Sequence, residues 1–511
     1  MFCKVMAGGI HGINSFLAQV EVDSTQAMPG FDMVGLLGSE VREAKERVRV
    51  ALKNSGFQIP PKRITVNISP ADIRKEGSAY DLPIAVGILV SLEKLGEEVL
   101  KETLFIGELG LDGEIKPVKG ILPIMIMAKE QGIRRCILPK DNAREGAVIE
   151  GIKVIGVSSF LETLRYLMEE KEKADEIIPP MTLDIDALFQ DTGAQNNPDF
   201  ADIRGQETVK RAAVIAAAGF HHLLITGTPG AGKTMIAKRI PSILPALSRK
   251  ESLEVSKIYS VSGLLKEGCP LITKRPFLHP HHTISRQALA GGGRIPRPGI
   301  LSLSHRGILF LDELPEFGRD NIEVLRQPLE DKEVQIARNY GSITYPADIM
   351  LVAAMNPCPC GFYPNRDRCS CTETEIRKYR SRISGPIYDR IDICVEAKAV
   401  ELEELQKGGR EESSEELKAQ VMRARKIQEK RYHNSPYFFN ADLETKDIGK
   451  YCFLGEEEAK YMEKVFYSFQ LSARAYHRTL KVARTIADLE ESEEIRKAHL
   501  AEAICYRGFE L

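Results

Sequence analysis

The sequence contains no apolar run near the roughly 18 residues that a membrane-spanning helix needs, and no low-complexity, collagen-like or coiled-coil segment. Its first residues, MFCKVMAGGIHG, lack a basic start followed by an apolar core, so we expect no signal peptide. Together these absences predict a cytoplasmic protein without a membrane partner. A strong charge of one sign is also missing. The formal net charge is −2, so any contact with nucleic acid needs a local basic surface.

The composition is that of a folded globular protein, and 511 residues suggest about two to four domains. Residues 1–168 mix strand-like and helix-like runs, which predicts an α+β domain. Residues 169–200 are polar and contain IIPP and TGAQNNP, as expected of a linker. In residues 201–400 apolar strands alternate with helices, which predicts a parallel sheet with helices on both faces. Residues 401–511 are helical and charged, with a capping box at Ser414. The predicted fold class is α/β.

The stretch LLITGTPGAGKT reads as a strand, a glycine-rich loop and the start of a helix, and it matches G-x-x-x-x-G-K-[ST]. In such a loop, successive backbone N–H groups turn toward phosphate oxygens. Lys233 would bring charge to the β- and γ-phosphates of ATP, and the Thr234 hydroxyl would bind Mg²⁺. The expected nucleotide-binding residues of the loop are Gly227, Thr228, Pro229, Gly230, Ala231, Gly232, Lys233 and Thr234.

A second apolar strand, ILFL, ends in the acidic pair Asp312 and Glu313. The carboxyl ends of parallel strands face the ligand crevice of an α/β sheet, so the pair should lie beside the phosphate loop. Asp312 would hold Mg²⁺ and Glu313 would act as general base for the attacking water. The alternative is that these acids only cap the next helix.

Several motifs together resemble the YifB/ComM family of magnesium-chelatase-like AAA+ ATPases over nearly the whole chain. They are LITGTPGAGKT, GILFLDELPEF, LVAAMNPCPCG, SGPIYDRIDI and LSARAYHRTLKVARTIADLE. The resemblance implies a Lon-protease-like (ribosomal S5-like) N-terminal domain, an AAA+ core and a C-terminal helical lid.

The resemblance also implies roles for residues outside the phosphate loop. Gly205 and Gln206 would lie near the adenine, and Asn356 would be the first sensor of the γ-phosphate. Arg390 would be the arginine finger and Arg474 the second sensor. A finger that acts on the neighbouring subunit implies a ring, most often a hexamer.

Two alternatives stay open for these arginines. Each could instead form a surface salt bridge. Arg382 also lies near Arg390 in the sequence and competes with it for the role of finger.

The N-terminal region resembles the proteolytic domain of Lon in GSAYDLPIAVGILVSL and FIGELGLDGEIKPVKGI. That chemistry needs a serine nucleophile and a lysine base. Tyr80 stands at the serine position, with Ser78 two residues early, and Leu122 stands at the lysine position, with Lys119 three residues off. We therefore expect no peptidase activity. The domain would support ring assembly or contact nucleic acid, or it would be a plain scaffold.

Basic and aromatic residues on two inserted loops are candidates for DNA contacts. Arg286 precedes a triple glycine and Arg294 and Arg297 follow it, and Arg338 and Tyr340 lie near the tip of a predicted hairpin. Such side chains suit tracking of the sugar-phosphate backbone without reading of bases. The alternative for each patch is a solvated surface.

Four cysteines, Cys358, Cys360, Cys369 and Cys371, follow Asn356 closely. In a reducing compartment, four nearby thiolates suit a structural Zn²⁺. The C-x-C spacing departs from the common C-x-x-C pattern, so plain reduced cysteines remain the alternative. If zinc binds, the loop would carry motion at Asn356 to a surface facing DNA or the next subunit. Elsewhere in the sequence, the two consecutive histidines His281 and His282 are interpreted as structural.

The sequence thus predicts an ATP-hydrolysing ring motor acting on branched or duplex DNA, as in branch migration during recombination of incoming DNA in natural transformation. A protein-remodelling ATPase of the magnesium-chelatase type is the alternative. An ATP-dependent protease is disfavoured by Tyr80 and Leu122.

Overall fold

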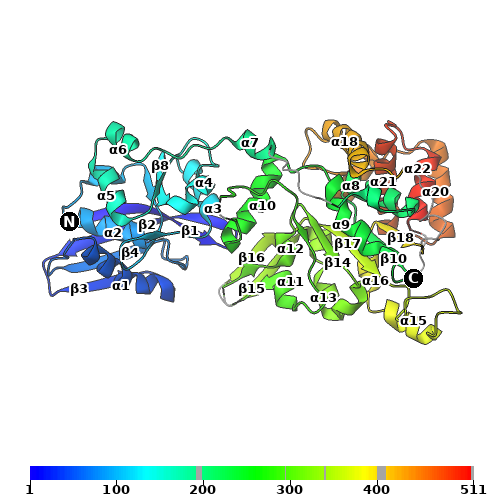
Figure 1. Ribbon diagram of the computed structural model, residues 1–511, viewed down its shortest axis with the longest axis horizontal. Coiled ribbons are helices and arrows are strands. Elements are labelled where there is room, and N and C mark those ends of the chain that lie inside the picture. The colour runs from blue at the N-terminus through cyan, green and yellow to red at the C-terminus, as the bar shows by residue number, and fades with distance from the viewer. Residues whose placement is uncertain (191–197, 267, 294, 339–340, 400–409, 508–511) are drawn as a thin grey trace. The chain divides into compact units, whose positions relative to one another are not determined.

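A computed structural model describes residues 1–190, 198–266, 268–293, 295–338, 341–399 and 410–507 (Figure 1). The chain forms two compact units. Unit 1 consists of Met1–Thr192 and Arg249–Thr273, and unit 2 of Gly193–Ser248 and Lys274–Leu511. The predicted α/β fold class is confirmed, since both units combine sheets with helices.

Unit 1 is built on a seven-stranded mixed sheet in the order β3-β4-β2-β1-β5-β8-β9. Strands β1 and β2 form a long antiparallel hairpin, while β1, β5, β8 and β9 run parallel. The strands are β1 (Phe2–His11), β2 (Asn14–Thr25), β3 (Gly30–Val34), β4 (Arg63–Ser69), β5 (Thr103–Phe105), β8 (Arg135–Pro139) and β9 (Lys153–Val157), and β6 (Glu108–Leu109) pairs with β7 (Ile115–Lys116) outside this sheet.

Alternation along the strands gives this sheet two apolar faces. Val5 and Ala7 of β1 join one buried cluster, whereas Met6 between them packs against the other. The first face is covered by α1 and α2, and the second by α3. The helices are α1 (Ser39–Asn54), α2 (Asp81–Ser91), α3 (Ile121–Glu130), α4 (Ala143–Gly146), α5 (Phe160–Met168), α6 (Lys171–Ile177) and α7 (Ile185–Gln190).

Residues 249–273 fold with unit 1, although they lie inside the range 201–400 that the sequence assigned to the ATPase core. Helix α10 (Arg249–Ser262) packs on α3, and Leu253 and Leu271 contact the apolar cluster around that helix. Ser260 O accepts a hydrogen bond from Gly120 N, and Ser260 Oγ donates to buried Glu145 at 2.5 Å. Burial of these apolar and polar groups explains why the segment folds with unit 1 and not with the rest of the predicted ATPase core.

The positions that correspond to the Lon dyad lie inside unit 1. Tyr80 and Leu122 are both buried, and burial raises the pKa of Tyr80. Within the described residues, the Tyr80 hydroxyl has no hydrogen-bond partner. Ser78 Oγ donates to the Glu108 carboxylate, and the Lys119 side chain lies against Gly263. These contacts give no serine-lysine pair at the two predicted positions.

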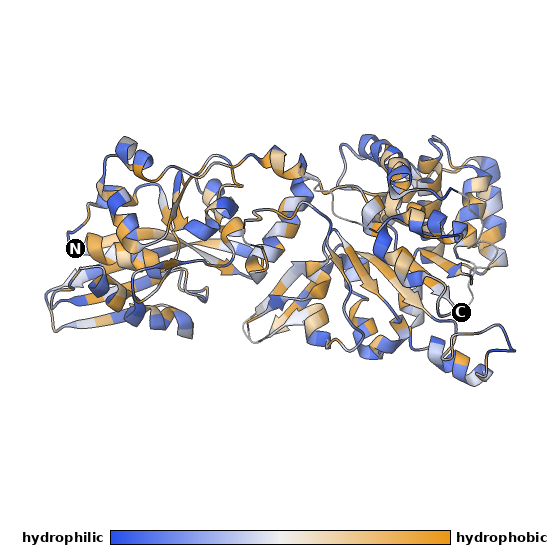
Figure 2. Ribbon diagram, in the orientation of Figure 1, coloured by the Kyte–Doolittle hydropathy of each residue, from blue (hydrophilic) through white to orange (hydrophobic). Residues whose placement is uncertain are grey.

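Unit 2 is centred on a five-stranded sheet in which every neighbouring pair is parallel, in the order β11-β14-β17-β10-β18. Its central strands are fully buried, and they are among the most hydrophobic segments in Figure 2. The strands are β10 (Leu223–Gly227), β11 (Phe277–Leu278), β14 (Ile308–Leu311), β17 (Met350–Met355) and β18 (Ile393–Ala397), and two separate hairpins are β12 (Gly291–Gly292) with β13 (Arg297–Pro298) and β15 (Glu333–Arg338) with β16 (Gly341–Pro346).

The C-terminal helices share one buried core with this sheet, because α18 and α21 pack on α8. Helix α18 begins at Ser414 but its cap is Ser413, which accepts from Glu416 N. The predicted cap at Ser414 was therefore wrong by one residue, and the Ser414 hydroxyl instead accepts from Phe200 N. The main helices are α8 (Glu207–Gly219), α9 (Lys233–Ile243), α11 (Arg286–Ala290), α12 (Ile300–Leu303), α13 (Arg319–Val324), α14 (Pro328–Asp331), α15 (Glu373–Arg380), α16 (Gly385–Tyr388), α18 (Ser414–Arg431), α19 (Thr445–Tyr451), α20 (Glu456–Ser468), α21 (Ala473–Leu489) and α22 (Lys497–Cys505). Across the described parts of the chain, no helix has both the length and the apolar character needed to cross a bilayer.

Glu145 generates a test of the anchoring of α10. Burial raises its pKa above the ordinary 4.5, and hydrogen bonds from Ser260, Leu122 N and Asn142 offset only part of this effect. The folded state then holds the proton more tightly than the unfolded chain, so the carboxylate costs stability that grows as pH rises through the folded pKa. We expect the effect of Glu145→Gln on the free energy of unfolding to be more favourable at pH 8 than at pH 5, because the amide carries no charge at either pH and the carboxylate does so at pH 8.

Urea unfolding at the two pH values measures the difference. The exposed Glu150 supplies a matched control, since Glu150→Gln should change stability little at either pH. A gain from Glu145→Gln that is larger at pH 5 than at pH 8 would contradict the assignment.

Candidate nucleotide-binding site

The phosphate loop lies at the carboxyl edge of the unit 2 sheet, between β10 and α9. Gly230 and Gly232 have φ angles of +81° and +82°, in the left-handed region that strains residues with a side chain. No described atom lies within 4 Å of a Cβ built on either glycine, so the backbone conformation and not space requires glycine here. Backbone N–H groups held in this way, at the start of a helix, suit phosphate.

Lys233 is buried at the start of α9, and its ammonium group donates hydrogen bonds to three oxygen atoms. Nζ donates to Gly227 O at 2.7 Å, Thr228 O at 3.0 Å and Asn356 Oδ1 at 3.0 Å. Burial lowers the pKa of Lys233, while the nearby Asp312 and Glu313 act in the opposite direction. The cation is thus held at the loop, and Asn356 at the end of β17 is in direct contact with it.

Thr234 and Asp312 fit the predicted magnesium site. Asp312 directly follows β14, and Thr234 Oγ1 donates to Asp312 Oδ2 at 2.7 Å. Hydroxyl and carboxylate oxygens are ligands that Mg²⁺ prefers. These two residues would hold the ion, which would neutralise charge on the β- and γ-phosphates.

Glu313 has an unusual backbone and a neighbour that the sequence did not indicate. Its φ is +53°, and its side chain is 57% exposed, open to an attacking water. His282 Nδ1 lies 3.8 Å from Glu313 Oε2, and the His282 ring packs against that of His281 with centroids 4.1 Å apart. Strand β11, a few residues before these histidines, pairs with β14 and so brings them beside the acidic pair.

Gln206 lies at the same edge of the sheet. Its Nε2 donates to Ala231 O in the phosphate loop at 3.2 Å and to Lys398 O just after β18. Gly205 N donates to Glu411 at 3.4 Å. Both residues therefore border the loop, where the resemblance places the adenine.

The two arginines Arg390 and Arg474 lie at the opposite edge of the sheet. Arg390 comes just before β18, and its buried side chain donates to Pro386 O at 2.6 Å and pairs with Glu330. Arg474 Nη2 lies 2.9 Å from the other oxygen of Glu330. A strand such as β10, with five residues, spans about 15 Å, so neither arginine reaches the phosphate loop of its own chain.

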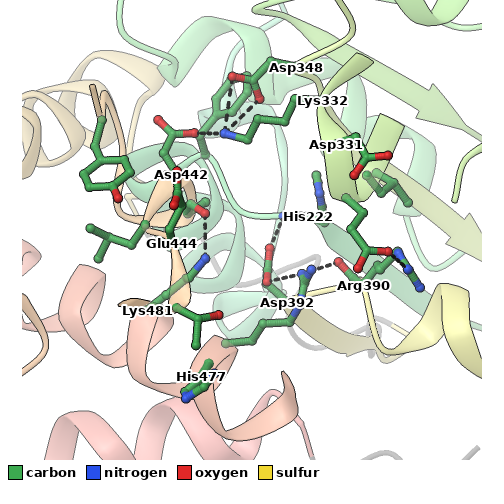
Figure 3. Close-up of a pocket in the computed structure, with 18 of the residues that line it drawn as sticks. His222, Asp331, Lys332, Asp348, Arg390, Asp392, Asp442, Glu444, His477 and Lys481 are labelled. Carbon is green, nitrogen blue, oxygen red and sulfur yellow. Dashed lines mark hydrogen bonds and ion pairs between the residues drawn. The ribbon is translucent and has the colours of Figure 1, made fainter. Parts of the chain in front are cut away.

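A cavity of about 780 Å³ opens at this amino edge and contains both arginines and Glu330 in its wall (Figure 3). His222, Asp348 and Asp392 also line it, each just before or within two residues of the start of β10, β17 or β18. The cavity is therefore separate from the phosphate loop, at the far ends of the same strands.

Arg382, the competing candidate for the finger, lies elsewhere. Its Nη1 pairs with Glu316 at 2.8 Å, three residues after Glu313, so it is on the side of the acidic pair. The side chain is 46% exposed. Arg382 and Arg390 thus belong to different edges of the sheet.

Comparison with known proteins connects this geometry to a family. Three family models match, described as magnesium chelatase subunit ChlI at residues 199–405, subunit ChlI of Mg-chelatase at 20–142 and the ChlI C-terminal region at 411–507. The competence protein ComM of Haemophilus influenzae is 41% identical over 502 residues, which cover 97% of this chain and 96% of ComM. YifB of Escherichia coli is 41% identical over 506 residues, covering 98% and 96%. This chain belongs to the YifB/ComM family of magnesium-chelatase-like AAA+ ATPases.

A weaker similarity concerns the N-terminal part. An archaeal Lon protease from Pyrococcus abyssi is 30% identical over 151 residues, 29% of this chain and 15% of that protein. The predicted Lon-like character of the N-terminal region is confirmed. Membership of the AAA+ family implies ATP hydrolysis with Mg²⁺.

The four cysteines of this AAA+ ATPase come together after β17. Sγ–Sγ distances are 3.4 Å for Cys358–Cys360, 3.7 Å for Cys358–Cys369 and 3.5 Å for Cys360–Cys369, and all four Sγ atoms lie within 4.8 Å of one another. The group could hold a metal ion.

The two loops proposed for DNA lie side by side in unit 2. Tyr345 Oη of β16 donates to Pro296 O at 2.8 Å, and a Cβ built on Gly291 would lie 2.9 Å from Ile336 Cδ1 of β15. Arg297 of β13 is exposed, and Arg338 ends β15. Arg294 and Tyr340 lie outside the described residues.

The acidic pair generates a test that separates binding from hydrolysis. Glu313→Gln removes the proposed general base but keeps the phosphate loop, so turnover should fall about 10²-fold or more while nucleotide affinity stays within a few fold. Lys233→Ala should abolish nucleotide binding itself. Turnover assays and fluorescent ADP titration measure both quantities, with Asp320→Asn on the exposed start of α13 as control. Normal turnover in Glu313→Gln would exclude it as the base.

Proposed function

We propose that this ATPase works as a hexameric ring, as is common in its class, and uses ATP hydrolysis to move along branched or duplex DNA. The position of Arg390 and Arg474 carries the proposal. Both lie at the sheet edge opposite the phosphate loop of their own chain, so in the proposed mechanism they act on the nucleotide of a neighbouring chain. Head-to-tail contact of that kind forms a ring when the rotation between successive chains closes, and we propose that it does here.

The proposed mechanism assigns each group one task. The phosphate loop and Lys233 hold the triphosphate, Asp312 and Thr234 hold Mg²⁺, and Glu313 accepts a proton from the attacking water. Asn356 links the γ-phosphate position to Lys233. The arginines of the neighbour would stabilise the charge that develops on the transferred phosphoryl group, an effect worth about 10³-fold in rate.

DNA is the proposed substrate because of the two paired loops and the family membership. Exposed Arg297 lies on a hairpin that contacts the β15–β16 hairpin, and this surface would offer a positive charge to the sugar-phosphate backbone. ComM is named a competence protein, and we infer that this chain also acts in recombination of incoming DNA, by branch migration. We expect no peptidase activity.

A protein-remodelling role is the second candidate, because all three family models carry the name of a magnesium chelatase subunit. The two functions differ in their response to DNA. A remodelling ATPase would hydrolyse ATP at the same rate whether or not DNA is present.

We also infer that the four cysteines hold a structural Zn²⁺. Four Sγ atoms within 4.8 Å match a closed thiolate site. A tetrahedral site with Zn–S bonds of about 2.3 Å has sulfur atoms about 3.8 Å apart, close to the separations in this group.

An ATPase titration tests the choice of substrate. Turnover should rise several-fold with four-way or forked DNA and less with single strands, and the apparent affinity should fall steeply with salt. Arg297→Ala should weaken binding to all these DNAs and reduce the salt slope by about 1. The exposed Lys464 on α20 supplies the control variant Lys464→Ala, which should behave as the native chain. No change of turnover with any DNA would favour the remodelling role.

Mixed rings test the shared site. Glu313→Gln chains keep their arginines, and Arg474→Ala chains keep their phosphate loop, so each alone should be nearly inactive. In an equal mixture, about a quarter of the interfaces pair an intact loop with intact arginines, and turnover should recover to about that fraction. Arg474 is 60% exposed, so its replacement should not disturb folding. A mixture no more active than the two separate variants would exclude arginines that act on a neighbouring chain.

A further inference from the structure

The cysteine loop has almost no apolar core of its own. Its buried cluster consists of Cys358, Cys369, Cys371 and Ile376, with Cys360, Phe362 and Tyr363 packed against them. A loop with so few aliphatic side chains gains little free energy from burial. Four sulfur atoms at its centre would hold it together only if something bound to all of them.

The surroundings match the charge of a metal-thiolate group. Zn²⁺ with four thiolates carries two negative charges in total. Arg366 Nη1 donates to Cys371 O at 3.0 Å, and its guanidinium lies 5.0 Å from the centre of the Tyr363 ring. Arg368 stacks on Phe362 at 4.3 Å, and Arg380 lies over Tyr363 at 5.3 Å. Arg366 also pairs with Glu373, which offsets its charge, so the cations that complement the anionic cluster are Arg368 and Arg380.

The loop is in contact with the phosphate loop. A Cβ built on Gly361 would lie 2.6 Å from both Cδ and Cγ of Pro229, so the two loops touch where only glycine fits. The φ of Gly361 is +86°, a conformation that also favours glycine. Cys360 directly precedes this contact, so a metal bound there would fix the backbone that packs on Pro229.

A second connection runs through the sensor. Asn356 Oδ1 accepts from Lys233 Nζ at 3.0 Å, and Cys358 follows only two residues later. Between them, Pro357 O accepts from Arg380 Nε at 3.2 Å, which ties this short connection to α15 after the cysteine loop. Displacement of the cysteines would therefore move both Asn356 and the wall of the phosphate loop.

We propose that metal occupancy of the cysteine site controls the affinity of the phosphate loop for Mg·nucleotide. The inference rests on the proposed nucleotide site, and it adds a regulator: a thiophilic divalent cation, Zn²⁺, at a place that does not touch the nucleotide. Coupling between two binding sites is reciprocal, so nucleotide must also tighten the metal by the same factor. We expect a factor of about 10, within the range typical of coupled sites.

The first measurement uses the full chain purified with zinc. Elemental analysis should give close to one zinc per chain. Fluorescent ADP with Mg²⁺ is then titrated before and after removal of zinc by a chelator that does not bind Mg²⁺, and again after zinc is restored. Affinity should fall about tenfold on removal and recover on restoration. In the converse titration, zinc release by a competing dye should slow when ADP is present.

Two variants separate the metal from the contact. Cys371→Ser should lose zinc and bind ADP about as weakly as the stripped chain, whereas Cys505→Ser, at an exposed cysteine outside the cluster, should change neither quantity. Gly361→Ala should keep zinc but lose most of the zinc dependence of ADP binding, because the added methyl pushes on Pro229. Circular dichroism and thermal unfolding confirm that each variant is folded.

The outcomes are distinct. Less than about half a zinc per chain from zinc-replete cells would overturn the metal site and the inference with it. Zinc that binds and leaves without any change in ADP affinity would overturn the inference alone, and the proposed ATPase would stand. Failure of the zinc-loaded chain to bind ADP at all would remove the proposed function together with the inference.

Discussion

All five strands of the unit 2 sheet run in the same direction, and this constraint decides which charged groups can share a site. The strands β10, β14 and β17 end at one edge, which brings Asn356 within hydrogen-bond distance of Lys233 and Asp312 within hydrogen-bond distance of Thr234. The same direction sends residues that precede a strand to the other edge, where Arg390 lies. The phosphate loop and Arg390 of one chain therefore lie at opposite ends of the same strands.

The amino edge is held to the C-terminal helices by ion pairs. Lys332 lies 3.4 Å from Asp348 and also pairs with Asp442, while Arg478 of α21 lies 2.7 Å from Asp392. Asp392 is buried and its pKa is well below the ordinary value, because Arg478 and the neighbouring histidines outweigh the effect of burial. Removal of one partner would leave a buried charge, so these pairs fix α21, and with it Arg474, relative to the sheet.

The sequence alone allowed prediction of those site groups whose partners are close in the chain or lie at the ends of neighbouring strands. The phosphate loop and the acidic pair are motifs of a few residues, and the parallel sheet brings them together in the predicted way. Contacts that depend on long-range packing were not accessible. The pairing of β11 with β14 puts His282 beside Glu313, and Glu330 meets Arg474 across 144 residues.

The placement of helix α10 also could not be predicted from the sequence, because it depends on which of the two units the helix packs in. Its pattern is that of an amphipathic helix, but nothing in the sequence states which apolar surface it covers. The α3 cluster of unit 1 and buried Glu145 supply that surface. Contact between Gly361 and Pro229 is a further example, since the glycine is explained only by a neighbour more than a hundred positions away.

Glu330 stabilises two arginines, Arg390 and Arg474, whose positive charges would otherwise repel each other at the amino edge of the sheet. Each of its carboxylate oxygens serves one guanidinium, and the Arg390 hydrogen bond is the main reason why its pKa lies below the ordinary value. One negative charge against two positive charges leaves a surplus of one, which attracts an anion. A γ-phosphate carries more charge than a single carboxylate, so in the proposed ring the neighbour's nucleotide would compete successfully with Glu330 for both arginines. The carboxylate thus holds both guanidinium groups at one spacing in the free chain, and in the proposed ring it would release them to the phosphate of the neighbouring chain.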